Sequence, residues 1–221
     1  HDNLGFMALN VPGADVYTIK LYDKNNSIDV LVSIVQVLQK NGVIIYRTDT
    51  MYALGCLITS QQAIQRICDI KQIKPNKNRF SFICSDLSAI ANYAKVSDVN
   101  FKLLKHYLPG PYTFVLPASS NVPSVLVQGK KTVGVRIPDY PPMLELIKEL
   151  NAPLLTTTLA HDGLDVEEFT DPSLIFDQYK NQVDLVLDGG FGGIFSSSVI
   201  DLTEELPSII REGAGQCDDF K

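Results

Sequence analysis

Hydrophobic residues along the chain follow two spacings, one typical of buried strands and one typical of helices with a single apolar face. Residues 43–46 form a continuous apolar run of β-branched and aromatic side chains. Such a run predicts a strand buried on both faces, in the middle of a sheet. In residues 28–38 the apolar side chains recur at helical spacing. Ser27 is placed to cap the start of this helix, and Asn41 with Gly42 to end it.

Strand and helix patterns alternate through the rest of the chain. The spacing predicts further strands over residues 14–22 (near an edge of the sheet), 80–84, 112–116, 132–136, 154–158, 183–188, 197–202 and 208–211. It predicts helices over residues 60–70, 85–93, 97–107, 139–150 and 171–179, with Asp139 as the cap of the fourth. This alternation favours an α/β fold, and the short strand pairs near the end predict a mixed sheet flanked by helices.

The length and composition fit one large domain. The chain has 221 residues, 45% of them hydrophobic, and it contains no internal repeat or evident linker. We therefore expect a single domain over residues 1–221, with residues 1–13 as a flexible N-terminus or the remnant of a tag. No apolar run reaches the roughly 18 residues of a membrane span, and no signal peptide opens the chain. The four cysteines are scattered without a C-x-x-C pair, which predicts reduced core thiols and a cytoplasmic protein.

The charge of the chain is unevenly distributed. The net charge of −6 argues against nucleic-acid binding by the whole surface. Residues 61–110, however, carry eight Lys and Arg against three Asp and no Glu, so this segment is +5 within an acidic protein. Such an asymmetry can direct an anion to one face of the molecule.

The sequence lacks the motifs of several common chemistries. It has no G-x-x-x-x-G-K-[ST] or G-x-G-x-x-G phosphate loop, no G-x-S-x-G nucleophile turn, and no histidine with a partner at metal-ligand spacing. We therefore expect neither a metal site nor a covalent intermediate. The predicted strand ends carry hydroxyl and cationic side chains instead: Thr48, Thr50, Lys71, Thr113, Arg136, Thr156, Thr157, Thr158, Ser197, Ser198 and Arg211. These groups suit a polyanionic ligand held by charge and hydrogen bonds, although each one alone is more often a surface group.

Two of these places carry a more specific expectation. The segment Thr48–Thr50 follows the central strand, where α/β sheets form their ligand crevice; the alternative is a polar turn that ends the strand. In residues 132–136, strand alternation places Gly134 and Arg136 on one face. Because Gly134 would leave open space beside the guanidinium, we expect Arg136 to bind a ligand and not to form a structural ion pair.

Six motifs, in order along the chain, resemble one family. They are TDTMYALG from residue 48, LPGPYTF from 108, VGVRIP from 133, PLLTTTL from 153, VDLVLDGG from 183 and IIREGAG from 209. The set resembles the YrdC-like threonylcarbamoyl-adenylate synthases, and most of all their YciO branch, over about residues 27–215. The resemblance implies a twisted, open α/β sheet with a concave, positively charged cleft.

The resemblance also implies a reaction and a set of site residues. Family enzymes join L-threonine, bicarbonate and ATP into threonylcarbamoyl-AMP, release pyrophosphate, and so supply the threonylcarbamoyl modification of tRNA. By position, the substrate-binding residues are Thr48, Thr50, Tyr52, Arg136, Thr156 and Ser198, with Arg136 on the carboxylate of threonine. The nucleotide-binding residues are Lys71, Thr113, Thr158 and Arg211, with Lys71 and Thr158 as the catalytic groups. ATP or an adenylate is the expected nucleotide, with Mg²⁺ accompanying ATP and no tightly bound cofactor.

The chain departs from the family pattern in two motifs, and a family histidine in the strand after the first of them is replaced near Ile83. The synthases carry K-x-R-P where this chain reads KQIK from residue 71, and S-x-N where it reads TLA from residue 158. Ile73 therefore stands in place of the arginine, and Ala160 in place of the asparagine. Lys74, Lys77 or Arg79 could replace the charge of the arginine, but no side chain replaces the amide.

Three functions are compatible with these features. The first is an enzyme that acts on threonylcarbamoyl-AMP, either as a weak synthase or as a hydrolase. The second is a non-catalytic module that binds double-stranded RNA or tRNA through the same basic cleft; the lack of interleaved aromatic residues in the basic stretch argues against it. The third is an inherited fold that has lost its ligand.

Overall fold

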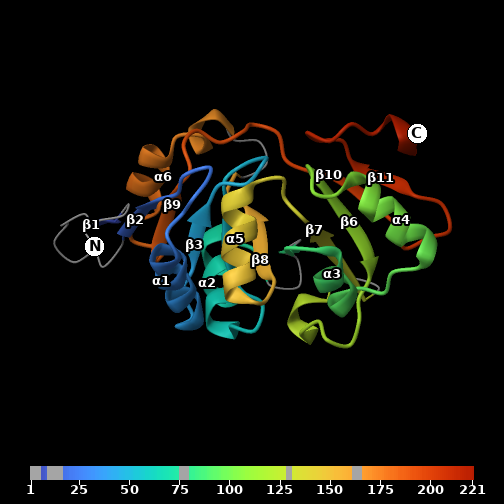
Figure 1. Ribbon diagram of the computed structural model, residues 1–221, viewed down its shortest axis with the longest axis horizontal. Helices are drawn as coiled ribbons and strands as arrows, with labels where there is room; N and C mark the ends of the chain where they lie inside the picture. Colours follow the sequence, from blue (N-terminus) through green and yellow to red (C-terminus); the bar gives the residue numbers. More distant parts are fainter. Residues whose placement is uncertain (1–5, 9–16, 75–79, 128–130, 161–165) are drawn as a thin grey trace.

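A mixed sheet of 11 strands runs through the molecule (Figure 1). The structure is a computed structural model, and it describes residues 6–8, 17–74, 80–127, 131–160 and 166–221. Along the sheet the strands follow the order β1-β2-β9-β3-β4-β8-β5-β7-β6-β10-β11. Their bounds are β1 (Phe6–Ala8), β2 (Tyr17–Lys20), β3 (Ile44–Tyr46), β4 (Ala53–Leu57), β5 (Ser81–Ile83), β6 (Tyr112–Pro117), β7 (Thr132–Arg136), β8 (Leu154–Thr158), β9 (Leu185–Asp188), β10 (Ser198–Asp201) and β11 (Ser208–Arg211).

Both parallel and antiparallel pairs build this sheet, as the sequence predicts. β3 is parallel to β9 on one side and antiparallel to β4 on the other. All of its residues are buried, which confirms the prediction of a strand buried on both faces. β2 lies one strand in from the edge, as predicted, although residues 14–16 of the predicted strand lie outside the described residues.

The helices begin where side chains can accept hydrogen bonds from the free N–H groups of their first turns. Ser27 Oγ accepts from the N–H of Asp29 at 3.2 Å, and Asp171 caps its helix through the N–H of Ser173 at 2.9 Å. The α-helices are α1 (Ile28–Gln39), α2 (Gln61–Lys71), α3 (Leu87–Tyr93), α4 (Asp98–Tyr107), α5 (Pro141–Leu150) and α6 (Pro172–Tyr179). Short 3₁₀ helices follow at η2 (Ser124–Leu126), η3 (Val166–Phe169) and η4 (Asp218–Phe220). No helix in the described part of the chain is long and apolar enough to cross a membrane.

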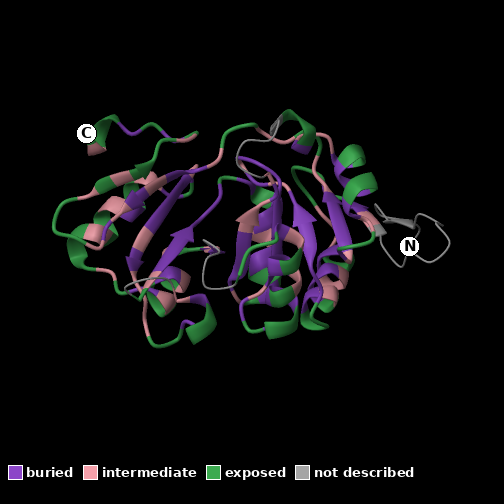
Figure 2. Ribbon diagram, turned by 180° about the vertical axis from the view of Figure 1, so that it is seen from behind, coloured by how far each residue is buried: buried purple, intermediate pink, exposed green. Residues whose placement is uncertain are grey.

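Helices cover the two faces of the sheet unequally. On one face, residues of α2, α3, α4 and α6 pack against strands along almost the whole sheet, including Phe114 and Val135 of β6 and β7. On the other face, α1 and α5 lie side by side over the part of the sheet around β3 (Figure 1). Among the described residues, the apolar cluster under α1 and α5 includes no side chain of β6, β7, β10 or β11. Figure 2 shows buried residues concentrated on the strands and exposed ones on the outer sides of the helices.

One strand was missed, and two expectations about the elements were wrong. β4 was not predicted, because the segment before it was interpreted as a site turn and its apolar run is short. Asp139 does not cap α5: the cap position is Tyr140, which makes no side-chain capping bond. Ile28, expected on the buried face of α1, is 57% exposed because it lies in the first turn, beyond the edge of the apolar cluster.

We expect Cys56 and Cys84 to be unreactive in the folded protein. All four cysteines are buried, and burial raises the pKa of these two thiols to about 12. Because the thiolate is the reactive form, a thiol reagent at about pH 8 should modify these two residues only after unfolding. Mass spectrometry of the labelled protein, with and without denaturant, measures this. Rapid labelling of either residue without denaturant would contradict the packing described here.

Candidate functional site

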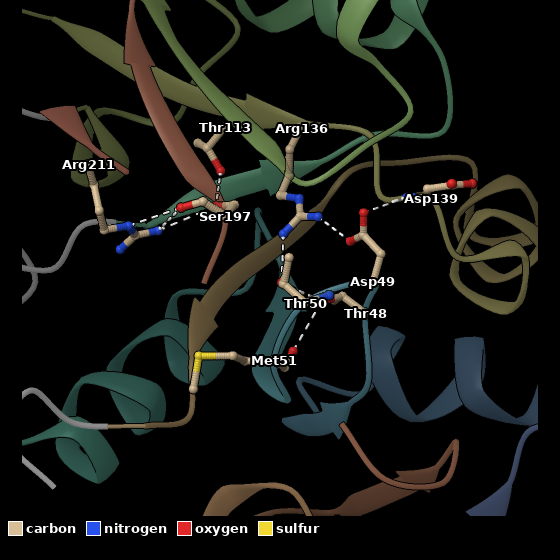
Figure 3. A network of polar contacts seen from close by, with 9 residues as sticks. All are labelled: Thr48, Asp49, Thr50, Met51, Thr113, Arg136, Asp139, Ser197 and Arg211. Atoms are coloured by element: carbon tan, nitrogen blue, oxygen red, sulfur yellow. Dashed lines mark hydrogen bonds and ion pairs between the residues drawn. The ribbon is translucent and has the colours of Figure 1, made fainter. Parts of the chain in front are cut away.

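The turn after β3 is held rigid by its own threonines. Thr48 Oγ1 accepts from the N–H of Thr50 at 3.0 Å and donates to the carbonyl of Met51 at 3.1 Å. The two threonine hydroxyls also lie 2.9 Å apart, and either oxygen can donate. Both side chains are buried. The predicted turn is therefore present, and its geometry is fixed by hydrogen bonds that occupy nearly all the donor and acceptor positions of the Thr48 hydroxyl (Figure 3).

Arg136 extends from the end of β7 into this turn. Its Nη2 forms an ion pair with Asp49 Oδ1, and its Nη1 donates to Thr50 Oγ1 at 3.2 Å. The other carboxylate oxygen of Asp49 accepts from the N–H of Asp139 at 3.0 Å. The side chains of Arg136 and Asp49 are only 6% and 10% exposed. The expectation that Arg136 forms no structural ion pair is therefore wrong, because a buried guanidinium needs a counter-charge and Asp49 supplies it.

The expected open space at Gly134 is also wrong. A side-chain carbon added there would lie 3.0 Å from Ser81 Oγ and 3.2 Å from Thr113 Cγ2. The glycine instead lets the side chains of two neighbouring strands close over β7. A row of small residues crosses the sheet here by direct pairing, with Gly55 opposite Thr156, Thr156 opposite Ser81, and Ser81 opposite Gly134.

A second polar network lies beside the first (Figure 3). Thr113 Oγ1 of β6 and Ser197 Oγ, just before β10, lie 2.8 Å apart and are both buried. Arg211 at the end of β11 donates to the carbonyl of Ser197 from Nε at 3.0 Å and from Nη2 at 2.8 Å. Thr113 and Arg211 were predicted from the sequence to act together on the nucleotide, and Ser197 is the residue that joins them.

Ser198, predicted to bind substrate, has a different environment. Its hydroxyl is fully buried, donates to the carbonyl of Gly215 at 2.5 Å, and accepts from the N–H of Gly213 at 2.9 Å. Ser198 thus fastens the C-terminal segment to β10, and its neighbour Ser197 takes the place beside Thr113. Since adjacent residues of an extended chain point to opposite sides, only one of the two could face the cluster.

The hydroxyl of Tyr52 also forms hydrogen bonds with the backbone in this structure. Its hydroxyl donates to the carbonyl of Gly190 at 2.6 Å and accepts from the N–H of Gly189 at 3.2 Å. Gly190 has a φ of +85°, which favours glycine. Burial raises the pKa of Tyr52 above the usual range of a phenol, so it remains a neutral donor. The residue predicted for substrate binding therefore holds the glycine turn that follows β9.

Lys71 ends α2 and reaches the end of β8. It is buried, and its Nζ donates to the carbonyl oxygens of Thr158 at 2.8 Å and Ala160 at 3.1 Å. The structure therefore brings Lys71 together with Thr158 and Ala160, the two ends of the segment that corresponds to the family's S-x-N. Thr158 meets Lys71 through its backbone carbonyl, and not through the hydroxyl that the sequence comparison emphasised.

Four buried side-chain atoms lack a hydrogen-bond partner in the described chain: Tyr46 Oη, Arg47 Nε, Arg136 Nε and Tyr140 Oη. Tyr46 and Tyr140 belong to the cluster under α1 and α5, and burial raises the pKa of both phenols. Arg47 donates from Nη1 to the carbonyl of Gly189 at 2.8 Å and lies over the ring of Tyr140 at 5.2 Å. Unsatisfied buried groups are rare in folded proteins, and of these four atoms Arg136 Nε belongs to the polar network of the turn after β3.

Sequence analysis placed Asp49 in the turn after the central strand but did not find its partners, and it gave Arg47 no role. Asp49 pairs with Arg136 and accepts from the N–H of Asp139, and Arg47 holds the glycine turn after β9. A charged residue directly after a buried strand was a signal for Arg47. No local signal pairs Asp49 with Arg136, because they are far apart in the sequence.

Two basic side chains of residues 61–110 are engaged within the fold. Arg66 pairs with Asp184 at 2.6 Å, and Lys71 is buried against carbonyl groups. Lys77 and Arg79 lie outside the described residues. The exposed members are spread over the loop after α2, the loop before α4 and α4 itself: Lys74, Lys95, Lys102 and Lys105. Within the described residues, no group of three or more His, Cys, Asp or Glu side chains could hold a metal ion.

These features define a class of protein: an α/β domain whose open mixed sheet carries arginine, hydroxyl and carboxylate groups on the face that helices leave uncovered. A profile of the Sua5/YciO/YrdC family, described as telomere recombination, matches residues 36–213. The chain belongs to this family, as the six motifs predicted.

Particular relatives place the chain within the family. It is 42% identical to YciO of Escherichia coli strain K12 over 187 residues, which are 84% of this chain and 90% of that protein. The crystal structure of E. coli YciO has a TM-score of 0.86 at 38% identity and matches 93% of this chain and 100% of that one. Both the YciO-like identity and the predicted fold are therefore confirmed.

Two further relatives carry informative names. The threonylcarbamoyl-AMP synthase of Idiomarina loihiensis is 30% identical over 158 residues, 70% of this chain and 83% of that protein. The crystal structure of P. abyssi Sua5 complexed with L-threonine has a TM-score of 0.82 at 25% identity. That match covers 91% of this chain and 59% of the Sua5 chain.

We expect Ser198 to contribute mainly to stability. Ser198→Ala leaves the N–H of Gly213 without its buried acceptor and leaves the carbonyl of Gly215 only the weak bond from Cys217 Sγ, which should lower the free energy of unfolding by about 1–3 kcal/mol. Ser88→Ala is the control, because Ser88 is exposed on α3 and its loss should change stability by no more than about 0.5 kcal/mol. Urea unfolding measures both variants. If the two lose equally little stability, Ser198 does not fasten the C-terminal segment.

Proposed function

We propose that this protein binds L-threonine and an adenine nucleotide and acts on threonylcarbamoyl-AMP. It does so as a weak synthase from L-threonine, bicarbonate and ATP, or as a hydrolase of the adenylate, in connection with the threonylcarbamoyl modification of tRNA. Support comes from the family, from the relative named as a threonylcarbamoyl-AMP synthase, and from the Sua5 structure complexed with L-threonine.

The observation that carries the proposal is the joining of Thr50, Asp49 and Arg136 in one buried network. These residues come from the turn after β3 and from β7, and the sequence comparison assigns Thr50 and Arg136 to threonine. A guanidinium beside hydroxyl groups on an uncovered sheet face suits a carboxylate with a neighbouring hydroxyl. The threonyl half of the site is therefore equipped for its ligand.

The nucleotide half is less well equipped. Lys71 lies against the backbone of Thr158 and Ala160. The lysine of the family motif therefore meets Thr158, which stands in place of the family serine, and Ala160, which stands in place of the asparagine. Ile73 is apolar and 37% exposed, and neither it nor Ala160 has a side chain that can donate to phosphate. In a reaction that gathers charge on the α-phosphate, each donor aimed at that charge is worth several kcal/mol. We infer slow synthesis, with the adenylate still bound.

The chemistry asked of the protein is mainly positioning. In synthesis, the carbamate of threonine attacks the α-phosphate of ATP and pyrophosphate leaves; in hydrolysis, water cleaves the adenylate to release AMP. Arg136 and Thr50 would orient the threonyl group, and Thr113, Ser197 and Arg211 would face the nucleotide. Mg²⁺ would enter with ATP as part of the substrate. Preorganised hydrogen bonds, and not a protein nucleophile, would supply the rate enhancement.

We do not put forward the RNA-binding alternative as the main function. Two of the basic side chains that motivated it, Arg66 and Lys71, are engaged by Asp184 and by backbone carbonyls. The exposed lysines of residues 61–110 in the described chain come from two loops and one helix, and no RNA-binding motif accompanies them.

Calorimetry and product analysis test the proposal. Purified protein is titrated with L-threonine, ATP and threonylcarbamoyl-AMP, and each mixture is then analysed for pyrophosphate, AMP and threonylcarbamoyl-AMP. We expect measurable binding of the adenylate together with weak pyrophosphate release or slow AMP release. Absence of binding by all three ligands would contradict the proposed function.

We expect the double variant Ile73→Arg with Ala160→Asn to increase pyrophosphate release from ATP. Losing one donor to a developing charge typically costs a factor of about 10²–10³ in rate, so restoring two should raise synthesis by at least about tenfold. Val99→Arg is the control, because it adds the same charge on α4, where Val99 is 76% exposed. The assay contains threonine and bicarbonate, with a sample without threonine as a blank.

Two results would argue against this account. Robust pyrophosphate release by the unaltered chain would mean that Ile73 and Ala160 are not the cause of a defect. An equal gain in the double variant and in Val99→Arg would mean that added charge alone changes the rate.

A further inference from the structure

We propose that the C-terminal segment, residues 212–221, positions Ser197 and Arg211 for nucleotide binding, and that an anchor on α4 holds this segment in place. The inference rests on the proposed function, because that function places both residues at the nucleotide. It adds a set of positioning residues, which act on the nucleotide only through Ser197 and Arg211.

The first part of the segment lies against the backbone that carries Ser197. The N–H of Ala214 donates to the carbonyl of Ser196 at 2.8 Å, and Ser198 Oγ accepts from the N–H of Gly213 at 2.9 Å. A side-chain carbon added to Gly213 would lie 2.7 Å from both the carbonyl carbon and the carbonyl oxygen of Ser197. The two stretches of backbone are therefore in direct contact, and a displacement of the segment releases Ser197.

Arg211 depends on the same backbone. Its guanidinium donates to the carbonyl of Ser197 from Nε at 3.0 Å and from Nη2 at 2.8 Å, and Nη2 also donates to Ser197 Oγ at 3.4 Å. Ser197 Oγ in turn lies 2.8 Å from Thr113 Oγ1. Figure 3 shows Thr113 and Arg211 meeting at Ser197. Whatever holds the backbone of Ser197 therefore holds all three groups.

The far end of the segment is anchored on α4 and β6 (Figure 1, red). Tyr107 ends α4, and its ring centroid lies 5.1 Å from the ring of Phe220 and 5.1 Å from the ring of Tyr112. The hydroxyl of Tyr107 donates to Asp219 Oδ2 at 2.5 Å, and the hydroxyl of Tyr112 donates to the carbonyl of Gln216 at 2.9 Å. Aromatic pairs at this separation attract each other beyond the area that they bury. Rings and hydroxyls together thus fix the end of the segment.

An anchored segment favours binding because its groups are ordered before the ligand arrives. Each long side chain that has to be immobilised on binding lowers the affinity by about two- to tenfold. Arg211 and Ser197 avoid this cost as long as the segment holds them. The anchor follows β11, the last strand in the order of the sheet. We therefore expect loss of the anchor to leave the strand pairs intact and to act on the nucleotide half of the site.

The variant Phe220→Ala tests the anchor by calorimetry with threonylcarbamoyl-AMP and with L-threonine. Because Arg211 and Ser197 lose their order, we expect the adenylate to bind about threefold or more weakly, with the affinity for L-threonine unchanged. Unfolded protein would lower the number of binding sites, whereas a displaced Arg211 lowers their affinity, so the titration separates the two. Phe101→Ala is the matched control, because Phe101 is 42% exposed on α4 and should bind both ligands as the unaltered protein does.

Hydrogen exchange gives a second measurement. The N–H of Ala214, followed by NMR, should exchange faster in Phe220→Ala than in Phe101→Ala, since its bond to the carbonyl of Ser196 opens when the anchor is lost. Should Phe220→Ala fail to fold, Tyr107→Phe replaces it in both measurements. That variant removes the bond to Asp219, keeps the ring, and should change both readouts in the same direction.

The outcomes separate this inference from the proposed function. Unchanged adenylate affinity in the anchor variant, an equal loss in the control, or an equal loss for L-threonine overturns the inference and leaves the proposed function in place. An unchanged exchange rate at Ala214 also overturns the inference, because the anchor then does not hold the segment. Absence of adenylate binding by the unaltered protein removes the ligand of the proposed function, and the inference falls with it.

Discussion

The buried positive charge of Arg136 constrains the architecture of the site. Leaving a guanidinium unpaired inside a protein costs several kcal/mol, and none of the strands next to β7 supplies a carboxylate to this pair. The counter-charge comes from the turn after β3, with β4, β8 and β5 lying between the two in the sheet. The pair therefore joins two parts of the sheet that are separated by three strands. Small residues, Gly55, Thr156 and Ser81, stand opposite one another in those strands, and the ring of Tyr46 lies close to Gly55.

The unequal covering of the sheet explains why this buried ion pair is tolerated. α1 and α5 shield the part around β3 with apolar side chains, and the cluster that they form among the described residues does not extend to β6, β7, β10 or β11. Burying a polar group is unfavourable unless hydrogen bonds satisfy it. The two networks, one through Thr48 and Asp49 and one through Ser197, supply those bonds. One face of the sheet is therefore apolar core under α1 and α5 and carries the polar networks farther along.

The sequence predicted the elements better than the contacts. Periodicity and caps gave α1, α4, α6 and the buried strand β3, because those signals depend on near neighbours in the chain. The short strand β4 escaped, since five apolar residues beside a polar turn have no period of their own. The motifs picked out Thr48, Thr50, Thr113 and Arg136, which the structure places in the two polar networks.

The contacts of those residues could not be predicted from the sequence. Asp49 with Arg136, and Ser198 with Gly215, are pairings that depend on the folded sheet, so no local pattern could reveal them. The same holds for Gly134, where the sequence suggested a gap and the structure has the side chains of Ser81 and Thr113. A glycine in a strand marks a close approach as often as an open space, and only the neighbouring strands decide which.

Differences between the two halves of the site bear on how this branch of the family works. The threonyl half is fixed by bonds among Thr48, Asp49, Thr50 and Arg136, so changing any one member disturbs the others and the turn that carries them. At the proposed nucleotide half, Ile73 and Ala160 have apolar side chains, which form no hydrogen bonds, so we expect substitution there to disturb the fold less. Selection can therefore alter nucleotide chemistry at little cost in stability, while the amino-acid half is preserved by its role in folding. From that asymmetry we expect a protein that keeps the network of Thr48, Asp49, Thr50 and Arg136 and loses donors to phosphate.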